Sequence, residues 1–103
     1  MTGKAEVLKG VYLSSLDEGS VIDLETKSRH YRIEYLGGDK AWISGHPQLC
    51  PRPVLVQLQG STGQSTVESG FIGQGMHLVF RRVDDHVPVT TSEVMGIRIL
   101  PHV

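Results

Sequence analysis

The chain has 103 residues, of which 39% are hydrophobic and 12 are glycine. This length suits a single domain, residues 1–103, with a hydrophobic core of its own, and so much glycine suits a turn-rich β fold better than a helical one. The formal net charge is −1, with 10 basic and 11 acidic side chains spread along the chain, so the sequence lacks the basic stripe that nucleic-acid or membrane-surface binding favours.

The first elements are short and alternate in polarity. Residues 8–16 fit a helix and a strand equally well, so we expect one short element there without assigning its type. A turn is predicted over 17–20. Residues 21–26 and 31–35 then alternate apolar and polar side chains, which is typical of half-buried antiparallel strands.

The register of this first hairpin follows from parity. Residues directly opposite each other in an antiparallel pair share a face, and their numbers have a constant sum. Leu24 and Ile33 must face the same core, so this sum must be odd, as when Leu24 pairs with Ile33. The turn over 27–30 must then have even length. The same reasoning pairs Ile33 with Ile43 and leaves 37–39 as a three-residue loop. A slip by one residue would turn the whole apolar set outward, so Ile33 and Ile43 are predicted core residues.

The second half of the chain repeats this pattern less regularly. Residues 44–53 hold three prolines and cannot form a central strand, because proline lacks a backbone donor. Strands are expected around 54–59 and 76–81, with a polar loop over 60–66 between them. The predicted close of the chain is a short edge strand over 87–91, a bend at Ser92-Glu93 and a last strand over 94–100 with Met95, Ile97 and Ile99 inward.

Together these elements predict an all-β fold: a compact antiparallel small β-barrel, or a strongly bent sandwich, of six to eight short strands. Small barrels of this kind fill their interior with side chains. Ligands therefore attach to an outer face or to the loops.

The run GFIGQGMHLVF over 70–80, followed by VTTS over 89–92, resembles short stretches in small bacterial all-β proteins that are described only as hypothetical. In outline the chain is also similar to small β-barrel regulatory and adaptor domains. The resemblance covers a minor part of the chain and carries no chemical motif. It implies a β fold and no functional residues.

His46 and Cys50 are the candidate metal ligands. They lie four residues apart in a proline-stiffened loop, and His77 or His86 would complete a zinc shell. Structural zinc takes four protein ligands, and catalytic zinc takes three and a water. The same pair could act as a thiolate and imidazole nucleophile, which also needs an orienting third group. The alternative is a buried cysteine that packs as a small apolar residue, next to a turn histidine.

The candidate binding surface is an outer face of the sheet. If Ile43 faces the core, parity places Trp42 outward beside Glu34, with Arg32 and Ser44 next to them. Tryptophan and arginine are enriched in binding hot spots, so these four residues are the predicted contact site. The alternative is that the N-terminal segment or the long loops cover Trp42, because tryptophan is highly buried on average.

These features favour a noncatalytic binding or regulatory module with no cofactor. A protein partner is favoured over a nucleic acid or a small ligand. A metal-binding or thiol enzyme centred on His46 and Cys50 is one alternative. A structural subunit that self-associates through open sheet edges is another, so a homo-oligomer stays open. The single cysteine excludes an intramolecular disulfide and suits a reducing compartment. With no signal-peptide pattern and no membrane-length apolar run, we expect a cytoplasmic protein.

Overall fold

The structure is a computed structural model that describes residues 6–48, 50–63 and 65–100. Over these residues the chain forms strands, one 3-10 helix and no α-helix, and none of its helices could cross a membrane. The elements are β1 (Glu6–Leu8), β2 (Gly10–Tyr12), η1 (Leu13–Ser15), β3 (Val21–Thr26), β4 (His30–Gly37), β5 (Lys40–Ser44), β6 (Val54–Thr62), β7 (Val67–Ser69), β8 (Phe71–Gly73), β9 (His77–Arg82) and β10 (Val89–Leu100).

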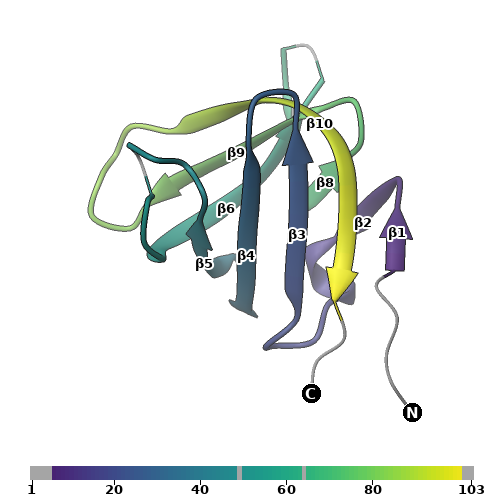
Figure 1. Cartoon of the computed structure of the whole chain (residues 1–103), viewed down its shortest axis with the longest axis horizontal. Coiled ribbons are helices and arrows are strands. Elements are labelled where there is room, and N and C mark those ends of the chain that lie inside the picture. The colour runs from purple at the N-terminus through teal and green to yellow at the C-terminus, as the bar shows by residue number, and fades with distance from the viewer. Residues whose placement is uncertain (1–5, 49, 64, 101–103) are drawn as a thin grey trace.

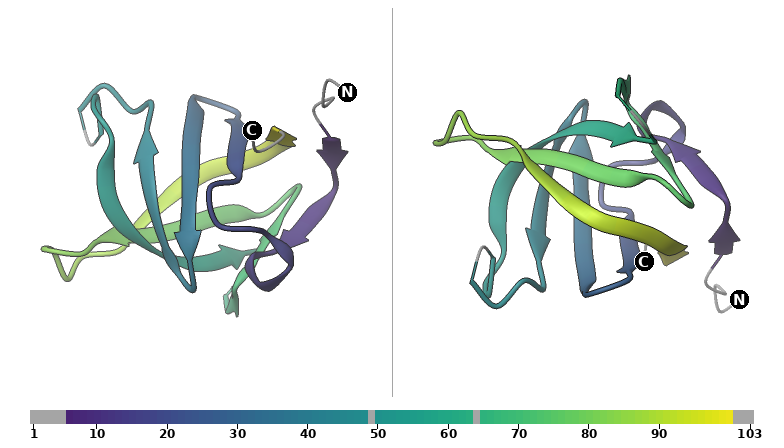
Figure 2. Two further views of the ribbon diagram at one scale, coloured as in Figure 1. Left: turned by 90° about the horizontal axis from the view of Figure 1, so that it is seen from below. Right: turned by 90° about the horizontal axis from the view of Figure 1, so that it is seen from above.

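The strands close into a six-stranded antiparallel barrel. β10, β3, β4, β5, β6 and β9 pair in that order, and β9 returns to pair with β10. Figure 1 shows β3, β4 and β10 side by side, and Figure 2 shows the strands curving around a common interior. β1 adds to β10 and β7 adds to β6, while β2 and β8 form a separate pair. The predicted all-β barrel is confirmed.

The predicted register between β4 and β5 is confirmed. Ile33 lies opposite Ile43, and neither side chain keeps any exposed surface. The loop between these strands is shorter than predicted, because Gly37 pairs with Lys40 inside the ladder and only residues 38–39 remain outside it. A shift of register near Gly37 accommodates the extra residue, as a β-bulge does.

The parity of the β3–β4 hairpin is right, but the exact pairing differs. Leu24 lies opposite Tyr31 rather than Ile33. The N–H of Thr26 donates to the carbonyl of Arg29 at 2.8 Å, which makes the turn tighter than expected. Because the difference is an even number of residues, every side chain stays on its predicted face.

The loop predicted over 60–66 is wrong in its first half, because β6 runs on to Thr62. Ser61 is fully buried. Its hydroxyl donates to the carbonyl of Phe71 at 2.7 Å and accepts the N–H of Gly73 at 3.2 Å. A buried hydroxyl needs such partners. The backbone of β8 thus allows a polar residue to continue a buried strand, which the local sequence pattern does not reveal.

The end of the chain is one long strand, not an edge strand and a last strand separated by a bend. β10 shifts register against both β9 and β3. The register shift between Val94 and Gly96 interrupts the alternation of inward and outward side chains. Val94 is therefore buried, and Met95 is 44% exposed. Ile97 is buried as predicted, Ile99 is only partly buried, and the inward position of Met95 is wrong.

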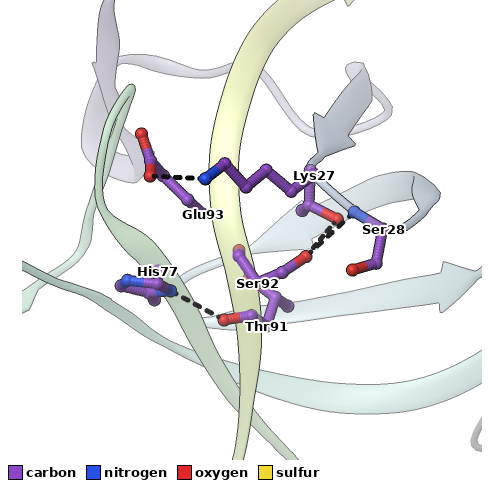
Figure 3. A network of polar contacts seen from close by, with 7 residues as sticks. Lys27, Ser28, His77, Thr91, Ser92 and Glu93 are labelled. Atoms are coloured by element: carbon purple, nitrogen blue, oxygen red, sulfur yellow. Dashed lines mark hydrogen bonds and ion pairs between the residues drawn. The ribbon is translucent and has the colours of Figure 1, made fainter.

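Polar contacts satisfy the backbone where β10 shifts its register against β9, as Figure 3 shows. The Ser92 hydroxyl accepts the N–H of Ser28 at 3.2 Å and donates to the Thr26 hydroxyl at 2.9 Å. The carbonyl of Thr91 lies 2.9 Å from Nδ1 of His77. These contacts tie β10 to β9 and to the β3–β4 turn, so the irregular part of β10 is held from both sides.

Apolar side chains fill the barrel interior. Phe80, Leu58 and Val56 from the β6 and β9 side pack against the isoleucines and leucines of β3, β4, β5 and β10. The buried set includes Ile22, Leu24, Tyr31, Ile33, Ile43, Val56, Leu58, Leu78, Phe80, Val94 and Ile97. Because side chains occupy the interior, a ligand has to bind the outer surface or the barrel ends.

Candidate functional site

The four predicted contact residues lie on one outer face of β4 and β5. Glu34 is directly opposite Trp42, and Arg32 is directly opposite Ser44. Their inward neighbours on the two strands are buried in the core. Since successive side chains of a strand point to opposite faces, the buried residues direct these four outward.

These residues line a surface depression of about 400 Å³, to which Pro53 also contributes. We call it the outer-face depression. Trp42 keeps 39% of its surface exposed, so no described segment covers it. The interpretation of Trp42 as a residue covered by loops is therefore wrong. The aromatic ring is open to a binding partner, with apolar and charged groups beside it.

Pro53 is the residue of this depression that sequence reasoning missed. It lies in the proline-rich loop just before β6, and Val54 pairs with Ile43 at the start of that strand. Continuing the antiparallel count by one residue places Pro53 opposite Ser44. The register between β5 and β6 would have placed Pro53 in the depression. The sequence pattern alone does not define this register, because a long loop separates the two strands.

Two opposite charges flank the indole. Within the described part of the chain, neither Arg32 nor Glu34 makes an ion pair or a side-chain hydrogen bond. Asp23, which faces Arg32 across the ladder, lies 3.8 Å from the guanidinium of Arg98 instead. The charges of Arg32 and Glu34 are thus available to groups outside this chain.

The apolar surface continues from Trp42 to Leu55 on β6 and to Val83 just after β9. Leu55 is directly opposite Trp42 and is partly buried. The N–H of Val83 donates to the carbonyl of Leu55 at 3.3 Å, and Val83 is 43% exposed. The outer-face depression therefore borders an apolar row, with its charges on the opposite side.

His46 and Cys50 come together, but as the two ends of a turn. The N–H of Cys50 donates to the carbonyl of His46, and the N–H of Gly45 donates to the carbonyl of Cys50, both at 2.9 Å. Nδ1 of His46 accepts the N–H of Gln48 at 3.1 Å. The imidazole is thus engaged in its own turn, and Cys50 lies in the hydrophobic core with 1% exposure.

This arrangement suits neither metal nor thiolate chemistry. Burial raises the pKa of the Cys50 thiol, and a hydrogen bond from the His46 peptide only partly opposes it. The thiol is therefore protonated at neutral pH, whereas the thiolate is the nucleophile and the metal ligand. The described residues hold no group of three or more His, Cys, Asp or Glu side chains able to bind a metal ion.

Cys50 provides a direct test of core packing. We expect a disulfide reagent to label the native thiol at least about 100-fold more slowly than the urea-unfolded thiol, because a buried group reacts only when the structure opens. Stopped-flow absorbance measures both rates. A Cys50→Ser variant gives the background. Equal rates in the two states would show that Cys50 is accessible.

The same burial has a pH consequence. The folded state favours the neutral Cys50 thiol. The stability gained by burying this thiol is therefore fully present below the pKa of about 8.5 that the thiol has in the unfolded chain. It is lost as the pH rises towards the higher folded pKa. Burial also raises the pKa of Tyr31, which adds to the loss at high pH. Urea unfolding between neutral and alkaline pH should therefore show falling stability.

Comparison with protein-family models, with curated proteins and with solved structures found no match. The resemblance carried by residues 70–80 therefore stays a prediction. The function has to be argued from the chemistry of the surface.

Proposed function

We propose that this protein is a noncatalytic binding module whose outer-face depression binds a segment of a protein partner. The observation that carries the proposal is an accessible Trp42 in a depression bounded by Arg32 and Glu34. Binding energy concentrates in tryptophan and arginine, and charged groups around them set the orientation of a partner.

The chemistry of the depression describes the partner. An apolar side chain of the partner would pack against Trp42 and the adjoining row of Leu55 and Val83. An acidic group would meet Arg32 and a basic group would meet Glu34, because the two charges have opposite sign. Nucleic acid suits this face poorly, since Glu34 beside Arg32 cancels the positive charge that phosphates need. A cytoplasmic setting is part of the proposal, because a single free thiol suits a reducing compartment.

Self-association is the second candidate. Within residues 6–48, 50–63 and 65–100, β1 and β7 each pair with a neighbouring strand on one side only. Such edges can pair with a second copy of the chain. A sedimentation experiment over a range of concentrations separates a monomeric module from a self-associating subunit.

Replacement of Trp42 by alanine tests the proposed function. We expect a partner captured from cell extract by the wild-type protein to bind the Trp42→Ala protein about 2 kcal/mol more weakly, or about 30-fold. The folded state should lose no more than about 1 kcal/mol, because the partly exposed ring is not a core group. Titration calorimetry with the purified partner gives the first value, and urea unfolding gives the second.

Met95→Ala is the matched control, since Met95 is 44% exposed on β10, which forms no part of the outer-face depression. It should leave the affinity unchanged. A partner that binds both variants as tightly as the wild-type protein would remove this face as the binding site. A loss of stability of several kcal/mol in Trp42→Ala would show that the ring is structural.

A further inference from the structure

A second surface feature lies where the pairing of β2 with β8 ends. Tyr12 pairs with Phe71 at the end of the β2–β8 ladder, and the two rings lie 4.7 Å apart. The N–H of Leu13 then donates to the carbonyl of Gly70 at 2.8 Å. Beyond this bond the chain turns into η1 instead of continuing along β7. The line of β2 is therefore interrupted at the point where β7 begins.

The interruption leaves a groove of about 780 Å³, which we call the β7 groove. Its lining residues include Tyr12 of β2, Ser14 of η1, Gln59 of β6, and Val67 and Ser69 of β7. None of its lining residues belongs to the outer-face depression. The β7 groove is thus a separate site.

The backbone of β7 presents a free edge to this groove. Among the described strands β7 pairs only with β6, and the N–H of Gly70 donates to the carbonyl of Gln59 at 3.1 Å. In an antiparallel strand the N–H and C=O of one residue point to the same side, and successive residues alternate between the two sides. Counting back from Gly70, the N–H and C=O of Glu68 face β6, while those of Val67 and Ser69 face away from it.

We propose that the β7 groove binds an extended peptide segment of a partner, which adds as a strand to the free edge of β7 and occupies the line that β2 abandons at Leu13. Main-chain hydrogen bonds provide affinity in this mode, and pockets for alternate side chains provide selectivity. The N–H and C=O groups of Val67 and Ser69 supply those hydrogen bonds. This site is independent of the proposed binding face around Trp42.

The groove also indicates the kind of peptide. Tyr12 is 58% exposed and Val67 is 44% exposed, so an apolar side chain of the peptide has two apolar surfaces to contact. Among the described residues no lysine or arginine lines the groove, whereas Asp39 does. Hydrogen bonds from the amide of Gln57 and from Lys40 lower the pKa of Asp39, so its carboxylate is charged. Nζ of Lys40 lies 3.0 Å from this carboxylate and balances its charge, so the groove favours apolar, uncharged peptides over charged ones.

The probe is a library of random short peptides displayed on phage and panned against the whole protein. An enriched peptide is then synthesised with a fluorophore and titrated by anisotropy. Ser69→Pro removes the N–H at the free edge, and an edge strand accepts proline when that N–H faces away from the ladder. Ser69→Ala is the matched control, because it removes the hydroxyl and keeps the N–H.

We expect Ser69→Pro to weaken peptide binding about tenfold, the equivalent of one main-chain hydrogen bond, while Ser69→Ala stays within about twofold of the wild type. Tyr12→Ala should also weaken binding several-fold, and Trp42→Ala should not. If Ser69→Pro does not fold, slowed hydrogen exchange of the Val67 and Ser69 amides on peptide addition provides the same evidence, and its absence counts against the proposal.

The proposal is overturned if no peptide is enriched, or if the enriched peptides bind Ser69→Pro as tightly as the wild type. Loss of binding in Trp42→Ala would also overturn it, because the peptides would then belong to the outer-face depression. Concentration-dependent dimers that Ser69→Pro abolishes would assign the edge of β7 to a second copy of this chain instead.

Discussion

Replacing Ile33 by alanine is expected to lower the free energy of unfolding by about 2–5 kcal/mol. Ile33 has no exposed surface and lies between Ile22 of β3 and Ile43 of β5. Truncation removes apolar burial and leaves a cavity that paired strands on both sides cannot close. Urea unfolding followed by Trp42 fluorescence measures the loss.

Arg32→Ala is the control for this prediction, because Arg32 is the neighbouring residue on the outer face. An exposed substitution of this kind should change stability by no more than about 0.5 kcal/mol. Similar values for the two variants would contradict the register that places Ile33 inward.

The second large effect is expected for Gly45→Ala, at about 3 kcal/mol or more. Gly45 has φ +123°, and a Cβ atom there would lie 2.1 Å from the carbonyl oxygen of His30 on β4. The obstacle is backbone, so no side-chain rotation relieves it. The variant must either distort β4 or displace the turn that ends in Cys50.

Gly38→Ala separates the steric clash from the cost of the backbone conformation. Gly38 has φ +59°, but nothing lies within 4 Å of its added Cβ. Gly38→Ala should therefore lower the free energy of unfolding by about 1 kcal/mol, the cost of the left-handed conformation alone. Thermal unfolding compares the variants. An equally small loss for Gly45→Ala would mean that β4 and this turn do not approach closely.

Side-chain alternation was enough to predict the composition of the outer face. Arg32 and Glu34 point outward because Ile33 points inward, and Trp42 and Ser44 follow from Ile43 in the same way. This result did not need the correct pairing. Leu24 pairs with Tyr31 instead of Ile33, yet its face is right, because strand pairing can shift by two residues without turning a side chain over.

The tertiary structure decided what alternation cannot express. Met95 points outward and Ser61 lies in the core because bulges and distant partners, needed to close β9 and β10 into a barrel, alter the local period. Whether Trp42 is covered, and whether Pro53 reaches it, depends on where long loops return to the sheet.

The sequence by itself thus determined the fold class and the two faces of the central strands, because both follow from a local period of two. Only the tertiary structure decided the exposure of Trp42 and the free edge of β7. Both depend on contacts between segments far apart in the chain, and a local pattern holds no information about which distant segment covers a face or leaves an edge open.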